Sequence, residues 1–279
     1  MIEITLAKSA GFCYGVKRAV QLANEALNNT DELYSKGNVV NNKIVVDDLE
    51  SKGLKRFKDS SQLERNSNVL IRAHGITLSE LDAYETLQCK MIDATCPNVK
   101  KIHDIVRKYA DTDYKIIIIG DKDHPEVLAI ASYAGNDVDV ITSEKEVREY
   151  NKVCVVEQTT FSKEYAQKII DKIILASKEQ IIYNTICNAT TIRQNDVKEL
   201  AATNEAVIVI GDKESANSNR LYEIAKNINK NTFFVETADE LDFYKIRSFF
   251  KIGVTAGAST PNEVINNVID KIKGEITIK

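Results

Sequence analysis

Residues 115–127 read KIIIIGDKDHPEV, a run of apolar residues that closes on Gly120 and is followed by a polar turn. Residues 206–218 read AVIVIGDKESANS and repeat this order, with Gly211 in the place of Gly120. A short apolar run that ends in glycine before polar residues is typical of a buried strand that enters a loop. The two stretches therefore indicate an internal repeat.

The cysteines extend this repeat to the whole chain. Three of the five, Cys13, Cys96 and Cys187, divide the sequence into nearly equal parts, and a glycine follows each of them after 24 residues. These glycines are Gly37, Gly120 and Gly211. Self-similarity at a fixed period is the signature of internal duplication.

Each part then continues in the same order, with an extended stretch, a polar helix start and an apolar strand. Apolar residues at helical spacing follow, which predicts helices over residues 76–87, 160–173 and 259–272. We therefore predict an α/β fold of three similar units of parallel strands and crossover helices around a pseudo-threefold axis. The units are expected at residues 14–95, residues 96–186 and residues 187–279, the last completed by residues 1–13.

The loops at the carboxyl ends of parallel strands are where sites form in such units. Three sets of residues occupy matching loop positions and are expected to converge. They are Cys13, Cys96 and Cys187 at strand-to-helix turns; Asn41, His124 and Ser215 after the glycines; and His74, Thr159 and Ser259 at the ends of the third strands.

Three thiols at one axis suit a zinc site, a catalytic thiol or an iron–sulfur cluster. Structural zinc usually takes close pairs such as CxxC, which are absent here, and a single catalytic thiol needs no copies. A cluster held by three thiolates leaves one iron open to a substrate, so the spacing favours the cluster. Cys89 and Cys154 have no counterparts in the other parts and are expected to be small buried side chains.

Two further stretches predict chemistry at these loops. His124, Pro125 and Glu126 follow a strand, and a glutamate in a dry pocket is a suitable proton donor. Residues 214–220, ESANSNR, open a helix with hydroxyl and amide groups, which suits either ordinary capping or an anion pocket. His103, which has no counterpart, is expected at the surface. Neither GxGxxG nor GxxxxGK[ST] occurs, so a nucleotide fold has little support.

Composition narrows the classes of function. The chain has 279 residues, 43% hydrophobic and 28% charged, with a formal net charge of −4. No basic tract appears, which argues against nucleic-acid binding, and no apolar run approaches the ~18 residues of a membrane span. Without a secretion signal in residues 1–20, we expect a cytoplasmic protein without disulfides.

The motifs GFCYGVKRA, VVDDLESKG, RAHG, DATCP, HPEV, QTT, SANSNRL and AGASTP occur here in one order. In this the chain resembles the 4-hydroxy-3-methylbut-2-enyl diphosphate reductase family over nearly its entire length. The resemblance implies a trefoil of three α/β units around one 4Fe-4S cluster held by three cysteines. It implies an iron–sulfur oxidoreductase that removes the allylic hydroxyl of its substrate, giving isopentenyl and dimethylallyl diphosphate in the last step of the non-mevalonate isoprenoid route.

The same resemblance assigns roles to individual residues. It makes Cys13, Cys96 and Cys187 the cluster ligands, Glu126 the proton donor, and Thr159 a residue that orients the substrate and helps to pass the proton. It surrounds the diphosphate with Asn41, His74, His124, Thr159, Ser215, Ala216, Asn217 and Ser259. Because no flavin or nicotinamide motif is present, it implies ferredoxin or flavodoxin as the electron donor.

Three positions depart from the family pattern. Asn41 in VVNNK replaces a histidine, Ala216 replaces a serine, and Ala129 replaces a glycine. The loss of one imidazole weakens the expected charge of the anion pocket. The alternatives to the reductase are a non-catalytic protein that holds an iron–sulfur cluster or zinc, or a paralogue with a different anionic substrate.

Overall fold

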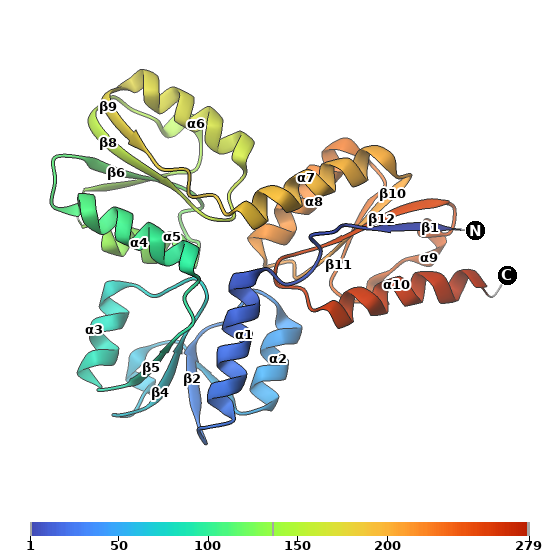
Figure 1. Ribbon diagram of the computed structural model, residues 1–279, viewed down its shortest axis with the longest axis horizontal. Helices are drawn as coiled ribbons and strands as arrows, with labels where there is room; N and C mark the ends of the chain where they lie inside the picture. Colours follow the sequence, from blue (N-terminus) through green and yellow to red (C-terminus); the bar gives the residue numbers. More distant parts are fainter. Residues whose placement is uncertain (1, 136, 278–279) are drawn as a thin grey trace. The chain divides into compact units, whose positions relative to one another are not determined.

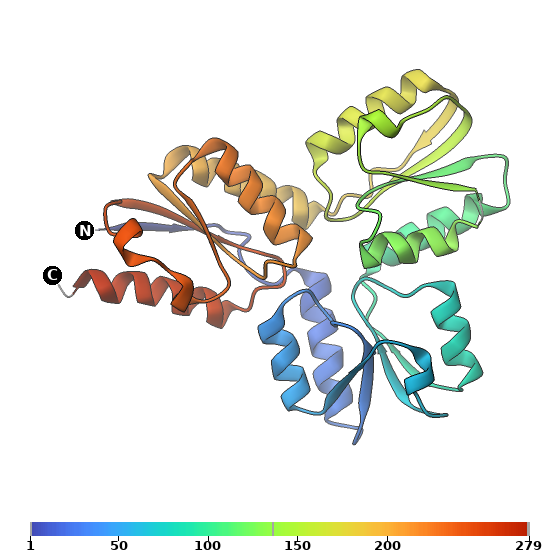
Figure 2. The ribbon, with the colours of Figure 1, turned by 180° about the vertical axis from the view of Figure 1, so that it is seen from behind.

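The computed structural model describes residues 2–135 and 137–277 and contains three four-stranded parallel sheets with flanking helices (Figures 1 and 2). The chain forms two compact units. One comprises Met1–Val16, Asn41–Val45 and Asn188–Lys279, and the other comprises Lys17–Val40 and Val46–Cys187. In the described ranges, no helix is both long and apolar enough to span a membrane.

The first sheet in chain order has the strand order β3-β2-β4-β5. Its strands are β2 (Leu33–Lys36), β3 (Leu54–Phe57), β4 (Asn68–Ile71) and β5 (Lys90–Asp93), and the associated helices are α1 (Tyr14–Leu27), α2 (Lys43–Ser51), η1 (Ser60–Gln62) and α3 (Leu78–Thr86). Thr77 and Glu80 form a capping box that starts α3. Tyr84 of α3 packs with Val69 and Ile71 in the core below it.

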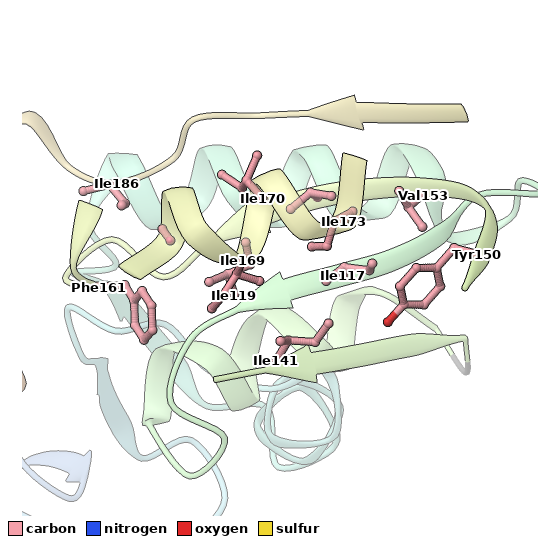
Figure 3. Packing of buried hydrophobic residues seen from close by; sticks show 12 residues of the cluster. Ile117, Ile119, Ile141, Tyr150, Val153, Phe161, Ile169, Ile170, Ile173 and Ile186 are labelled. Atoms are coloured by element: carbon pink, nitrogen blue, oxygen red, sulfur yellow. The ribbon is translucent and has the colours of Figure 1, made fainter. Parts of the chain in front are cut away.

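The second sheet has the order β7-β6-β8-β9. Its elements are α4 (Pro97–Ala110), β6 (Lys115–Ile119), α5 (Pro125–Tyr133), β7 (Val138–Ile141), η2 (Glu144–Glu146), β8 (Tyr150–Glu157), α6 (Lys163–Ala176) and β9 (Ser177–Ile182). Ile117 and Ile119 pack with Ile169 and Ile173 of α6 (Figure 3). Ile116 and Ile118 face the other side of the sheet and pack with α4 and α5. Burial on both faces explains the unbroken apolar run of β6.

The third sheet has the order β11-β10-β12-β1, so its fourth strand comes from the start of the chain. Its elements are β1 (Glu3–Leu6), α7 (Asn188–Thr203), β10 (Ala206–Ile210), α8 (Ala216–Ile228), β11 (Thr232–Val235), η3 (Ala238–Glu240), α9 (Phe243–Ile246), β12 (Lys251–Ala256) and α10 (Asn262–Thr277). Val207 and Val209 pack with α7 and α8, whereas Ile208 and Ile210 pack with α10.

Equivalent backbone hydrogen bonds confirm the three similar α/β units. The N–H of each glycine identified by spacing donates to the last residue of the second strand of its sheet. The pairs are Gly37 to Phe57, Gly120 to Ile141 and Gly211 to Val235, at 3.2, 3.1 and 2.9 Å. The predicted helices over residues 76–87, 160–173 and 259–272 correspond to α3, α6 and α10.

The shared strand order decides where a site can form. In each sheet the first and third strands of the repeat are neighbours. In the second and third sheets the helices that follow these two strands pack on opposite faces, which makes the carboxyl ends of the two strands a topological switch point. The loops after the first strands contain Asn41, His124 and Ser215, and those after the third strands contain His74, Thr159 and Ser259. The three repeat cysteines follow the fourth strands.

Candidate functional site

Each repeat cysteine lies directly before a helix: Cys13 before α1, Cys96 before α4 and Cys187 before α7. Each also donates its backbone N–H to a carbonyl in the loop after the third strand of the same sheet. The acceptors are Ala258 for Cys13, Ala73 for Cys96 and Thr159 for Cys187, at 3.0, 3.0 and 2.9 Å. The three cysteines are therefore held at equivalent places by equivalent bonds.

Exposure separates these cysteines from the other two. Cys13, Cys96 and Cys187 are partly exposed, whereas Cys89 and Cys154 are buried. Burial raises the pKa of the Cys89 thiol and raises that of Cys154 to about 12, so both stay protonated and unreactive. The prediction that these two are core side chains is confirmed.

Two nitrogen atoms approach the sulfurs of the repeat cysteines. The Val16 N–H lies 3.5 Å from Cys13 Sγ, and Asn98 Nδ2 lies 3.1 Å from Cys187 Sγ. Asn98 was missed by the sequence analysis, although its place in DATCPN, two residues after Cys96, was a signal. Within residues 2–135 and 137–277, no three His, Cys, Asp or Glu side chains form a group close enough to hold a metal ion. The ligand roles of the cysteines stay a prediction.

The structure brings Glu126 and Thr159 together. Glu126 is in the first turn of α5 and only 2% exposed. Its Oε1 accepts the Thr159 backbone N–H at 2.6 Å, and its Oε2 accepts the Thr159 hydroxyl at 2.7 Å. Burial raises the pKa of the Glu126 carboxyl to about 6, although the two hydrogen bonds partly lower it. Such a carboxyl exchanges protons near neutral pH.

His74 and His124 lie edge to face, with ring centroids 5.4 Å apart. The Glu126 backbone N–H donates to His124 Nδ1 at 3.1 Å, which leaves the proton of a neutral ring on Nε2. Burial lowers the pKa of His74 to about 3 and that of His124 to about 4, and the Arg72 guanidinium acts in the same direction. Both rings are therefore neutral hydrogen-bonding groups at pH 7.

Two details around Glu126 and Thr159 differ from the sequence prediction. Pro125 and Glu126 belong to helix α5, with His124 as its N-cap, rather than to a loop. The equivalent of His74 is Thr160 and not Thr159, because the hydrogen bonds Gly75 to Arg72 and Phe161 to Gln158 align the two turns. Thr159 instead matches Ala73, whose carbonyl holds Cys96.

In the compact unit that contains residues 188–279, several polar groups lie at the start of α8. Ser215 caps this helix by accepting the Ser218 N–H at 3.3 Å, and Ala216 is its first residue. Asn217 is buried, and its Nδ2 has no hydrogen-bond partner among the described residues. The Ser259 hydroxyl donates to the Asn41 carbonyl at 2.7 Å, so these two predicted site residues are neighbours.

The first repeat contains one extra residue before its helix. Asn42, not Asn41, occupies the capping position that matches His124 and Ser215, and its Oδ1 accepts the Val45 N–H at 3.2 Å. Counting four residues from Gly37 therefore gave the neighbour of the true cap. Asn42 was missed for this reason.

His103 is not a surface residue, contrary to the prediction. It is 5% exposed, and its ring stacks on Tyr133 of α5 with centroids 4.4 Å apart. A Cβ atom on Gly75 would lie 2.8 Å from His103 Cε1, so the histidine also packs against the turn that follows His74. Burial lowers the pKa of His103 to about 4.

Comparison with known proteins shows the family to which the chain belongs. The family model described as LytB protein matches residues 4–273. The chain belongs to the LytB protein family. The 4-hydroxy-3-methylbut-2-enyl diphosphate reductase of Geobacter sulfurreducens is 42% identical over 275 residues, which cover 98% of this chain and 97% of the relative. The protein of that name from Geobacter sp. strain M21 is 40% identical over 274 residues, covering 97% of each.

Solved LytB-family structures share the fold. A structure of (E)-4-hydroxy-3-methyl-but-2-enyl diphosphate reductase, the terminal enzyme of the non-mevalonate pathway, superposes with a TM-score of 0.72 at 37% identity and covers 98% of this chain and 100% of the other. The E-1-hydroxy-2-methyl-but-2-enyl-4-diphosphate reductase of Plasmodium falciparum gives a TM-score of 0.90 at 28% identity, covering 96% and 87%. The family predicted from the motifs is confirmed.

Proposed function

We propose that this LytB-family protein removes the allylic hydroxyl of 4-hydroxy-3-methylbut-2-enyl diphosphate by reduction. The products are isopentenyl diphosphate and dimethylallyl diphosphate, in the last step of the non-mevalonate isoprenoid pathway. Relatives that match nearly the whole chain bear the name of this enzyme, which supports the proposal. The observation that carries it is the buried pair of Glu126 and Thr159.

Glu126 is suited to supply a proton to the reacting carbon. The reaction replaces a carbon–oxygen bond by a carbon–hydrogen bond and releases water, so it consumes an electron pair and two protons. A carboxyl with a pKa of about 6 is available in its protonated form near neutral pH. The Thr159 hydroxyl on Oε2 orients the carboxyl and lies where a proton can pass. A structural metal protein would gain nothing from this costly buried acid.

Neutral donors account for recognition of the diphosphate. We assign this role to His74 and His124, and to Asn41, Ser215, Ala216, Asn217 and Ser259. The start of α8 favours an anion because its backbone N–H groups are unpaired within the helix. The unpartnered amide of buried Asn217 is a further donor that a phosphate oxygen would satisfy.

The cysteines fit an iron–sulfur cluster by the chemistry of their thiols. Cys13, Cys96 and Cys187 are partly exposed at helix starts, and cysteine thiolates are the usual protein ligands of iron–sulfur clusters. We propose that these three hold one 4Fe-4S cluster. When bound, the cluster supplies electrons and a Lewis-acidic iron without a cysteine ligand. Ferredoxin or flavodoxin is the proposed source of electrons.

Iron content tests this assignment directly. We expect Cys13→Ala, Cys96→Ala and Cys187→Ala each to lose most iron when the protein is purified without oxygen. The matched controls Cys89→Ala and Cys154→Ala should retain the iron of the wild type. Full iron content in any of the first three variants would contradict the three-ligand assignment, and a colourless wild type that contains zinc would contradict the cluster.

A further inference from the structure

Glu157 is a buried carboxylate that the proposed reaction does not use. It is the last residue of β8 and only 3% exposed. The residues at the same place in the other two sheets are Ile71, which ends β4, and Ala256, which ends β12. The other repeats therefore end their third strands on apolar side chains, and the carboxylate is peculiar to the second repeat.

The partner of Glu157 is the segment that leads to Cys187. Glu157 Oε2 accepts the Thr185 N–H at 3.0 Å. The Thr185 hydroxyl donates to the Glu157 carbonyl at 2.6 Å and accepts the Glu157 N–H at 2.6 Å. Thr185 lies two residues before Cys187.

This contact replaces a backbone bond found in the first repeat. There the Ala94 N–H donates to the Ile71 carbonyl at 3.0 Å, two residues before the matching bond from Cys96 to Ala73. The second repeat also has the bond from Cys187 to Thr159. Two residues earlier, however, the Thr185 N–H donates to the side-chain carboxylate of Glu157 and not to its backbone carbonyl. In the second repeat, side chains therefore connect the two segments at the place where the first repeat has a backbone hydrogen bond.

We propose that Glu157 is a positioning residue that fixes the backbone of residues 185–187 and so presents the Cys187 thiol to the metal cluster. We call the hydrogen bonds between Glu157 and Thr185 the clamp. The clamp is observed in the structure, whereas the role of Cys187 rests on the proposed function. Buried hydrogen bonds to a carboxylate are among the stronger ones in proteins, so their loss should free this segment.

Hydrogen exchange of the protein prepared without metal tests the clamp. In Glu157→Ala we expect the amides of residues 183–188 to exchange at least tenfold faster than in the wild type. Ala256 at the matching place indicates that alanine is compatible with this strand end. Thr185→Val should increase the exchange rate of these amides less than Glu157→Ala does. Thr185→Ser keeps the hydroxyl and should exchange at the wild-type rate. Residues 93–98, held by the backbone ladder, are the internal control and should not change.

Cluster retention tests the consequence for the metal. Glu157→Ala loaded with iron should lose it to a chelator several times faster than the wild type and than Thr185→Ser. Unchanged exchange at residues 183–188 would refute the clamp, and faster exchange with unchanged iron loss would refute its positioning role. A wild type that takes up no iron would instead refute the proposed function and the link to a cluster, while the exchange result, which needs no metal, would stand.

Discussion

The Glu126 carboxylate accepts both the backbone N–H and the hydroxyl of Thr159, at 2.6 and 2.7 Å. Glu126 lies in the first turn of α5, which follows β6, and Thr159 lies in the loop that follows the neighbouring strand β8. Two hydrogen bonds fix the carboxyl, and burial keeps its proton affinity high. This pair therefore combines positioning with a proton that is available at neutral pH.

The raised pKa of Glu126 predicts a pH-dependent cost to stability. In the unfolded chain a glutamate ionises near its ordinary pKa of 4.5, but in the folded protein Glu126 ionises only near a pKa of about 6. Folding is therefore penalised as pH rises through this window, by about 2 kcal/mol above pH 7. Glu126→Gln keeps the shape and escapes this penalty, so its free energy of unfolding should exceed that of the wild type by about 2 kcal/mol at pH 8.

The advantage of Glu126→Gln should nearly vanish at pH 4.5, where the carboxyl is largely neutral in the folded state. Denaturant unfolding at both pH values measures the difference, and Glu144→Gln on the η2 turn serves as a control because Glu144 is not buried. A difference between variant and wild type that does not change with pH would show that Glu126 titrates normally.

His103 is predicted to stabilise the packing of α4 against α5. His103→Ala removes the stack on Tyr133 and leaves a cavity beside Gly75, so it should lower the free energy of unfolding by about 2–4 kcal/mol. His103→Phe keeps an aromatic ring and removes a nitrogen, Nε2, that has no partner in the described chain, so it should cost less than about 1.5 kcal/mol. Chemical denaturation checks both values, and a loss below about 0.5 kcal/mol in the alanine variant would support a surface position.

Asn41→His introduces the histidine that the resemblance to the family implies at this position. The Ser259 hydroxyl bonds to the backbone carbonyl of residue 41, so the substitution leaves that contact in place. We expect diphosphate binding to tighten by up to about tenfold, and more at pH 6 than at pH 8, because only a protonated ring adds charge. Calorimetry at both pH values with Asn41→Gln as the control measures it. Equal or weaker binding at pH 6 would remove residue 41 from the anion pocket.

The fold could be predicted from spacing because the same residue types have the same structural role in each repeat. Gly37, Gly120 and Gly211 each directly follow the first strand of their repeat (β2, β6 and β10) and bond to the last residue of the second strand, so their distance from the cysteines is the same. The apolar run of Ile116–Ile119 is buried on both faces, which single-sequence patterns reveal directly.

Contacts between distant elements could not be predicted. His103 is surrounded in sequence by Lys100, Lys101 and Arg107, which suggests an exposed helix face, but its ring meets Tyr133 and the turn at Gly75. Asn42 was missed because one added residue breaks the count from Gly37. The bonds between Glu157 and Thr185 depend on how β8 pairs with β9, which a spacing argument does not contain.

The most direct test of the proposed function is product formation by the wild type. Protein with a reconstituted cluster, reduced chemically and kept free of oxygen, should convert 4-hydroxy-3-methylbut-2-enyl diphosphate to isopentenyl and dimethylallyl diphosphate. Glu126→Gln should contain the same iron and bind the substrate, but turn over at least about 10²-fold more slowly. A reduced, iron-loaded wild type that forms neither product would contradict the proposed function, and an equally active Glu126→Gln variant would remove the residue from the reaction.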